Sequence, residues 1–380
     1  MQTFLYVHIP FCLRKCRYCD FNSVDDSHVT PAEYIDGVVK EMGLRADRLA
    51  GHMSAPTLYF GGGTPSLLEP ALVARVIDAA ARLFGLEPDA EITLEANPGT
   101  LTAELLRGYR TAGVNRLSLG VQSFDDGQLQ FLGRVHTAAQ TRDALARARS
   151  AGFANIGIDL IHSLPGESLA RWRSDLAAAV ALRPAHISVY GLTIEEGTPL
   201  AALEEAGKLE PLSGDASAEM IREAMERLAG AGYGQYEIAN FARPGCRSRH
   251  NQAYWRRAPY LGFGAGAHSF LREGYGVRWC NAADPSGYLA SLAGGSLPDD
   301  ERQALSREDA RAEFMFLGLR MCDGVDTDAF RAEFGEPVEM VWPGTVELLV
   351  TAGLLERKGS VLRLTPRALP VANQLFVRFL

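Results

Sequence analysis

The chain has 380 residues, of which 47% are hydrophobic and 22% are charged, and its formal net charge at pH 7 is -8. This composition is ordinary for a globular protein, and the length predicts about two domains with a full hydrophobic core. The negative net charge excludes a general electrostatic attraction to nucleic acid.

The amino-terminal segment and the cysteines indicate the compartment. The first residues, MQTFLYVHIPFC, lack the basic start, the long apolar core and the cleavage site of a signal peptide. No apolar run is long enough to span a bilayer. Three of the six cysteines lie close together, which favours a reducing compartment over a disulfide framework. We therefore expect a cytoplasmic protein that is not integral to a membrane and binds no nucleic acid.

The first half of the chain alternates between strand and helix patterns. Strands are predicted at residues 4–9, 57–60, 91–95, 116–120, 155–160 and 186–190, and helices at residues 32–49, 70–83, 103–112, 138–151 and 169–182. Six strands separated by helices predict an α/β fold with right-handed βαβ units around a parallel sheet. The pattern alone does not separate an open sheet from a barrel.

Cys12, Cys16 and Cys19 follow the first predicted strand with the spacing C-x-x-x-C-x-x-C. Thiolates are soft ligands that suit iron–sulfur clusters or zinc. A four-iron cluster held by only three thiolates keeps one iron open to a small ligand, which indicates a site for chemistry. The triplet alone also permits two other interpretations, part of a zinc site or unrelated buried thiols.

Polar and glycine residues that apolar packing would not require follow the later strands. They are Gly61, Gly62, Gly63 and Thr64 in YFGGGTP, Glu95 in EITLEANP, Gln122 in LSLGVQSF, Arg134 in LGRVH and Asp159 in IGIDLI. Glycines let a backbone approach a ligand closely, and an arginine fork suits a carboxylate. An unpaired charge inside an apolar strand, as at Asp159, is costly. The alternatives are a flexible turn for the glycines and a solvated strand-end position for Glu95.

With these motifs in this order, the chain resembles the radical S-adenosylmethionine (SAM) proteins over nearly its whole length. It is most similar to the branch that contains oxygen-independent coproporphyrinogen III oxidases and HemW-type haem chaperones. The resemblance implies a partial (β/α)6 barrel, and a [4Fe-4S] cluster on Cys12, Cys16 and Cys19 whose fourth iron binds SAM. It also implies a set of SAM-binding residues, which are Tyr6, Tyr18, Gly62, Gly63, Thr64, Glu95, Gln122, Arg134 and Asp159.

Two features separate the branches of this family. The oxidases carry a further cysteine two residues after the third cluster cysteine, where this chain has Phe21, and a longer segment before the cluster loop. His250, Asn251, Tyr254 and Trp255 form H-N-x-x-Y-W, a signature of the haem-chaperone branch. An imidazole can ligate haem iron, and aromatic rings can cover a porphyrin face. These four residues are therefore the haem-binding candidates, with His250 as ligand; the alternative is a satisfied polar histidine or a helix cap.

The resemblance implies a haem chaperone that passes haem to recipient haemoproteins, which we expect among respiratory enzymes, membrane-bound ones included. The sequence does not identify an electron donor. The alternative is an oxygen-independent coproporphyrinogen III oxidase, which decarboxylates coproporphyrinogen III to protoporphyrinogen IX, and the complete SAM site supports it. Whether the chain is an enzyme depends on this choice, and the chaperone role is preferred.

The last part of the chain predicts a separate domain. Residues 284–300 are rich in loop-forming residues, and they divide a barrel domain with the haem-motif segment, 1–290, from a C-terminal domain, 300–380. Ser306 is predicted to cap a helix, and a hairpin is predicted around Lys358 and Gly359. This helical region resembles a winged helix, which we expect to cap the barrel opening rather than to bind DNA.

Overall fold

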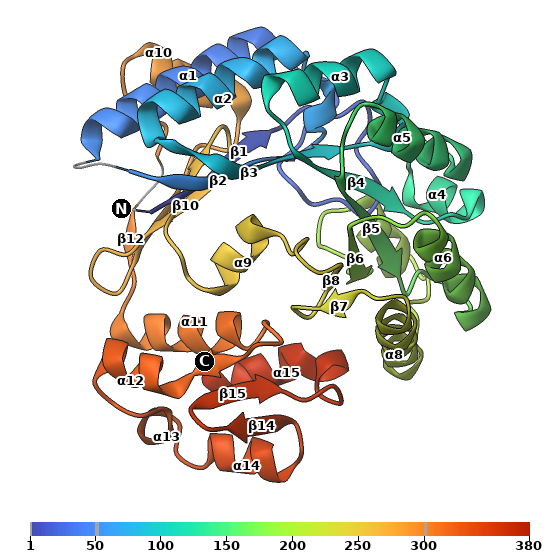
Figure 1. Cartoon of the computed structure of the whole chain (residues 1–380), viewed down its shortest axis with the longest axis vertical. Helices are drawn as coiled ribbons and strands as arrows, with labels where there is room; N and C mark the ends of the chain where they lie inside the picture. The colour runs from blue at the N-terminus through green and yellow to red at the C-terminus, as the bar shows by residue number, and fades with distance from the viewer. Residues whose placement is uncertain (1, 50–52, 300–301) are drawn as a thin grey trace.

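The computed structural model describes residues 2–49, 53–299 and 302–380. Its centre is a run of parallel strands, β1 (Phe4–Ile9), β2 (Ala55–Gly62), β3 (Leu86–Ala96), β4 (Arg116–Gln122), β5 (Asn155–His162) and β6 (His186–Gly191). The connections contain helices α1 (Pro31–Arg48), α2 (Pro70–Phe84), α3 (Ala103–Ala112), α4 (Asp126–Leu132), α5 (Ala138–Ser150) and α6 (Leu169–Ala181). Figure 1 shows these strands in an arc with the helices on its outer side. The predicted alternation and the partial barrel are confirmed.

Further strands extend this sheet at both edges. Beyond β1 come β9 (Tyr260–Phe263), which is parallel to β1, and then the antiparallel β10 (His268–Leu271), β11 (Val277–Cys280) and β12 (Gln303–Ala304). Beyond β6 come the antiparallel β8 (Asn240–Ala242) and β7 (Gly234–Gln235). The remaining helices of this part are α7 (Pro199–Glu205), α8 (Gly214–Gly230), α9 (Arg249–Trp255) and α10 (Pro285–Ala293). Helix α9 lies on the inner side of the arc (Figure 1).

The central strands have one apolar and one polar face, because successive side chains of a strand point to opposite sides. In β4, Leu117, Leu119 and Val121 are fully buried in the core that the helices cover. The alternate residues Ser118 and Gly120 line a cavity on the inner side instead. The sequence therefore directs its apolar residues to the helices and leaves a polar barrel interior.

Helix α10 lies within residues 284–300, where a loop was predicted, and that prediction was wrong for Pro285–Ala293. Asp284 caps this helix by accepting a hydrogen bond from the backbone amide of Gly287 at 2.8 Å. The helix packs closely on α1 at Gly37, where a Cβ atom would lie 2.3 Å from Leu289. The helix therefore depends on a tertiary contact that the local composition does not show.

The C-terminal part has its own hydrophobic core. It contains α11 (Arg307–Gly318), β13 (Val325–Asp326), α12 (Thr327–Phe334), α13 (Val338–Val341), α14 (Thr345–Thr351), β14 (Leu355–Lys358), β15 (Val361–Leu364) and α15 (Ala372–Phe376). Ser306 caps α11 in a capping box with Asp309, and β14 pairs with β15, so the predicted cap and hairpin are confirmed. Residue 300, the predicted start of this domain, lies outside the described residues, and the exact boundary stays a prediction.

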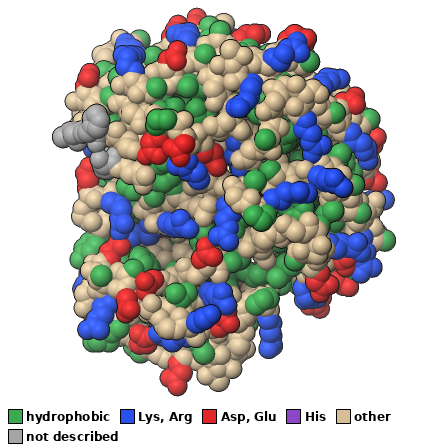
Figure 2. Space-filling view, in the orientation of Figure 1, with side chains coloured by type: hydrophobic (Ala, Val, Ile, Leu, Met, Phe, Trp, Pro, Cys, Tyr) green, Lys and Arg blue, Asp and Glu red, His purple; other side chains and the backbone are tan. Residues whose placement is uncertain are grey.

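The C-terminal part contacts α9 rather than the barrel cavity. The guanidinium carbon of Arg320 lies 4.2 Å from the ring centroid of Trp255, and Arg257 forms an ion pair with Glu313 at 3.4 Å. On the molecular face in Figure 2, basic and acidic side chains are interspersed. Within the described ranges, no helix combines the length and the apolar character that crossing a membrane requires.

A buried carboxylate joins α1 to the far edge of the sheet. Glu41 is fully buried, and one of its oxygens accepts hydrogen bonds from Arg45 at 2.7 Å and from Asn281 at 2.8 Å. The other accepts from the backbone amide of Gly264 at 2.9 Å and from the hydroxyl of Tyr288 at 2.7 Å. The Glu41 carboxylate and all four residues that donate to it are buried.

Replacing Glu41 with leucine is expected to lower the free energy of unfolding by about 3–5 kcal/mol, because Arg45 and several donors lose a buried partner. Urea denaturation of the full chain measures this change. The control is Glu104→Ala, whose ion pair with Arg107 is exposed and contributes at most about 1 kcal/mol. Equal stability of the two variants would contradict the expectation.

Candidate cluster and cofactor site

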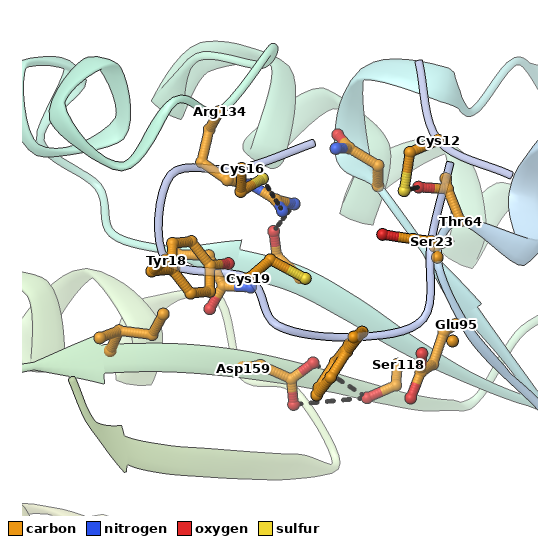
Figure 3. A pocket seen from close by; sticks show the side chains of 18 of the residues that line it. Cys12, Cys16, Tyr18, Cys19, Ser23, Thr64, Glu95, Ser118, Arg134 and Asp159 are labelled. Atoms are coloured by element: carbon orange, nitrogen blue, oxygen red, sulfur yellow. Dashed lines mark hydrogen bonds between the residues drawn. The ribbon is translucent and has the colours of Figure 1, made fainter. Parts of the chain in front are cut away.

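A cavity of about 350 Å³ opens on the inner side of the parallel strands. This volume lies within the range of about 300–1,000 Å³ that is usual for ligand pockets. Cys12, Cys16 and Cys19 all line it, on the loop that follows β1. Figure 3 shows this loop passing over the carboxylates of Glu95 and Asp159. The structure thus brings the cysteine triplet and the later polar motifs to one place.

Hydrogen bonds from several segments hold the cysteine loop in place. The amide of Cys12 donates to the carbonyl of Val24 at 2.9 Å, and the guanidinium of Arg14 donates to the carbonyl of Gly133 at 2.8 Å. The ring of His8, on β1, is hydrogen-bonded through Nε2 to the carbonyl of Asn22 at 2.7 Å. These contacts fix the loop on both sides of the cysteines.

The surroundings of the thiols fit an iron–sulfur cluster. Arg134 Nη1 lies 3.4 Å from Cys16 Sγ, and the hydroxyl of Thr64 lies 3.6 Å from Cys12 Sγ, so both sulfurs face hydrogen-bond donors that stabilise thiolates (Figure 3). Across the described ranges, no three His, Cys, Asp or Glu side chains converge on a single metal ion. Three thiols around one cavity suit a cluster, whose irons each take a different thiolate, better than a single zinc ion.

Most of the predicted SAM-binding residues line the same cavity, namely Tyr18, Gly62, Gly63, Thr64, Glu95, Gln122, Arg134 and Asp159. Tyr6 does not line it, and its hydroxyl is hydrogen-bonded to His8 Nδ1 at 3.1 Å. Arg134 Nη2 donates to the carbonyl of Gly120 at 2.8 Å, whereas its buried Nε has no hydrogen-bond partner among the described residues. This unused donor fits the binding of a ligand carboxylate.

The backbone at two of these positions takes conformations that side chains disfavour. Gly62 has a φ of 109°, and a Cβ atom there would lie 2.6 Å from the ring of His8. Gln122 has a φ of 66°, and the register between β4 and β5 shifts just before it. A positive φ at a non-glycine residue stores strain, which is frequent at ligand sites. A glycine is therefore required at position 62 by the positive φ and by the close approach of the His8 ring, so the glycine motif is more than a flexible turn.

Burial raises the pKa of two carboxyl groups in the cavity, those of Glu95 and Asp159. Burial raises the pKa of Glu95 to about 7, although the hydroxyl of Tyr59 donates to the Glu95 carboxylate at 2.7 Å. Burial likewise raises the pKa of Asp159, against hydrogen bonds from Ser118 and Ser188. A cationic or hydroxyl-bearing ligand would favour the ionised forms and so be bound by them.

Several lining residues were not predicted from the sequence. They are Tyr59, Arg116, Ser118, His186, Ser188 and Tyr190. Most of them alternate along β4 and β6 with residues of the apolar core. This alternation was the available signal in the sequence. It assigns these side chains to the inner face of the sheet only once the neighbouring strands are known to be parallel and covered by helices.

The predicted haem motif divides between the cavity and the core. Asn251 lines the cavity, whereas His250, Tyr254 and Trp255 do not. His250 is 1% exposed; its Nδ1 lies 2.7 Å from the hydroxyl of Thr57, and its Nε2 lies 2.9 Å from that of Tyr254. Burial lowers the pKa of His250 to about 3. Iron ligation by His250 therefore stays a prediction. It requires the ring to give up its hydrogen bond to Thr57 or to Tyr254 in exchange for the iron.

Comparisons with known proteins agree with this geometry. The model of the Radical SAM superfamily matches residues 6–179, and the model of the HemN C-terminal domain matches residues 305–371. The heme chaperone HemW of Bacillus subtilis is 35% identical over 376 residues, which cover 99% of this chain and 98% of that protein. The heme chaperone HemW of Lactococcus lactis is 35% identical over 379 residues, covering 99% and 96%. The solved structure of coproporphyrinogen III oxidase (HemN) from Escherichia coli aligns with a TM-score of 0.85 at 24% identity, covering 100% of this chain and 89% of that chain.

A partial barrel with three thiols above its cavity and a matching family model defines the radical SAM class of fold and site. A [4Fe-4S] cluster and SAM are the cofactors of that class, and the residues around the cavity fit both. The full-length likeness to relatives at 35% identity is more specific. The chain belongs to the HemW family of the radical SAM superfamily.

The affinity for SAM is expected to depend on the ionisation of Glu95. The ratio of the SAM affinities of the wild type and of Glu95→Gln should rise about tenfold between pH 6 and pH 8, because the ionised carboxylate accepts hydrogen bonds and forms as the pH passes about 7. Calorimetric titration of the reconstituted protein under anaerobic conditions measures both affinities. Taking the ratio cancels the titration of SAM itself, and a ratio that is constant with pH would remove Glu95 from this role.

Proposed function

We propose that this protein is a haem chaperone that holds a [4Fe-4S] cluster and SAM in the barrel cavity and delivers haem to recipient haemoproteins. The observation that carries the proposal is the 35% identity, over 99% of the chain, to proteins named heme chaperone HemW. Phe21 supports it, because this exposed side chain stands where the oxidases carry a further cysteine. The likeness to the solved oxidase, at 24% identity, supports the fold alone.

Within this function, the chain binds and orients its cofactors. The cluster supplies one-electron chemistry and an open iron site when it is bound. Arg134 binds the methionine carboxylate of SAM through its unused Nε–H, and the backbone at Gly62 and Gly63 receives the amino group. Glu95 accepts hydrogen bonds from SAM once it is ionised. His8 keeps the cysteine loop in position through Asn22.

The recipients and the compartment belong to the same proposal. We place the protein in the cytoplasm, supported by the three cysteines Cys12, Cys16 and Cys19, which line one cavity and form no disulfide with one another. The recipients are haemoproteins, with respiratory enzymes as the first to test, because the resemblance to the haem-chaperone branch implies them.

The second candidate function is oxygen-independent coproporphyrinogen III oxidase. The predicted SAM-binding residues around the cavity favour it, since haem transfer by itself does not require them. The two functions differ in the bound tetrapyrrole, finished haem or its reduced precursor, and in whether turnover occurs.

One anaerobic experiment separates the two functions. Reconstituted protein is incubated with SAM, a reductant and coproporphyrinogen III, and a parallel sample is titrated with haem. We expect stoichiometric haem binding, haem transfer to an apo-haemoprotein and no protoporphyrinogen IX. Formation of protoporphyrinogen IX without haem transfer would replace the chaperone by the oxidase.

The proposed ligand role of His250 has its own test. If Nε2 binds iron, His250→Ala should change the haem absorption spectrum and weaken haem binding by about tenfold or more. Tyr254→Phe is the matched variant, because it removes the hydroxyl that is 2.9 Å from Nε2 and should keep the spectrum of the wild type. Thermal unfolding of both variants reports any loss of fold. An unchanged spectrum in a folded His250→Ala protein would assign His250 to packing only.

A further inference from the structure

The deep end of the cavity carries polar side chains that the SAM contacts do not use. Arg116 and His186 are the first residues of β4 and β6, and Asn251 is on α9; all three line the cavity. Because β4 and β6 are parallel, Arg116 and His186 lie at the amino ends of their strands, whereas the cysteine loop follows the carboxyl end of β1. This group is called the cavity floor below.

Arg116 is a buried cation without a close anionic partner. Its side chain is 2% exposed, and Nη1 donates to the side-chain oxygen of Asn155 and to the carbonyl of Cys246, each at 3.1 Å. Both acceptors are neutral, and in the described ranges no carboxylate oxygen lies within 4.0 Å of this guanidinium. A buried charge is costly unless it is paired. The cavity floor is therefore suited to an anion.

The nearest carboxylates are engaged elsewhere. Glu91 accepts from the hydroxyl of Ser248 at 3.3 Å and from the backbone amides of the next two residues at 3.0 and 3.1 Å, and so caps the first turn of α9. Asp159 accepts a hydrogen bond from the hydroxyl of Ser118 at 3.3 Å, and it interacts with Arg116 electrostatically without forming an ion pair with it. Neither group neutralises Arg116 by direct contact.

His186 and Asn251 offer further unused hydrogen-bonding groups. His186 is 2% exposed; its Nε2 lies 2.8 Å from the hydroxyl of Tyr236, while its buried Nδ1 has no partner among the described residues. When Tyr236 donates to Nε2, the neutral ring carries its proton on Nδ1 and presents a donor. The space in front of Nδ1 is open because residue 157 is a glycine, whose Cβ would lie 3.5 Å from it.

We propose that Arg116, His186 and Asn251 form a carboxylate-binding subsite at the cavity floor, and that it takes a propionate group of haem. The planar fork of an arginine matches a carboxylate, and a neutral imidazole N–H and an amide add donors beside it. The inference rests on the proposed haem-chaperone function, because haem is the ligand of that function, besides SAM, that carries free carboxylates. SAM has one carboxylate, for which Arg134 provides the unused donor near the cluster loop.

Haem and haem dimethyl ester test the subsite, since the ester keeps the iron and the ring but has no ionised propionate. We expect the reconstituted wild-type protein to bind haem at least about tenfold more tightly than the ester, as charged hydrogen bonds of about 1.5–3 kcal/mol imply. Arg116→Gln should abolish this preference and leave the SAM affinity unchanged. The control Arg107→Gln, at an exposed position, should keep it.

A second variant covers the case in which Arg116→Gln does not fold. Gly157→Ala places a methyl group in front of His186 Nδ1 at an ordinary contact distance, and it should reduce the preference for haem over the ester. Equal binding of haem and ester by the wild type would overturn the subsite and leave the chaperone function standing. A loss of SAM affinity in Arg116→Gln would instead assign Arg116 to SAM. Failure of the wild type to bind either compound would overturn the chaperone function itself, and the subsite with it.

Discussion

The structure depends on the two-faced character of its parallel strands. In β4, the buried Leu117 and Leu119 alternate with Ser118 and Gly120, which line the cavity. The apolar face gains its free energy by burial against the helices, so the inner face does not have to be filled with apolar side chains. A barrel interior that is polar and partly empty becomes a ligand site, and the arc of strands in Figure 1 leaves room for it.

The loop over this interior is held by polar contacts as well as by packing. His8 joins β1 to Asn22, and Arg14 reaches the chain at Gly133, so the cysteines are positioned from two sides. Arg134 then serves two purposes, because it faces the Cys16 sulfur and retains an unused donor for a carboxylate. The same guanidinium therefore lies between the cysteine loop and the proposed SAM site.

The residues of the haem motif on helix α9 lie in different environments and do not all face the cavity. His250 is packed between hydroxyl groups, whereas Asn251 reaches the cavity and Trp255 meets the C-terminal part through Arg320. The motif thus lies between the cavity floor and the C-terminal part of the chain.

The resemblance to a family supplied the residues predicted to bind SAM, and all of them but Tyr6 line the cavity. The sequence also placed the six central strands and the cysteine loop, because these depend on local patterns: apolar strand segments, cysteine spacing and residues that follow strand ends. It did not reveal α10, which is stabilised by the contact at Gly37, or the buried state of His250, whose partner Thr57 is 193 residues away. Nor did it single out Arg116 and His186, which look like ordinary strand residues. These features follow from burial and charge pairing, which are properties of what surrounds a side chain and not of its own segment.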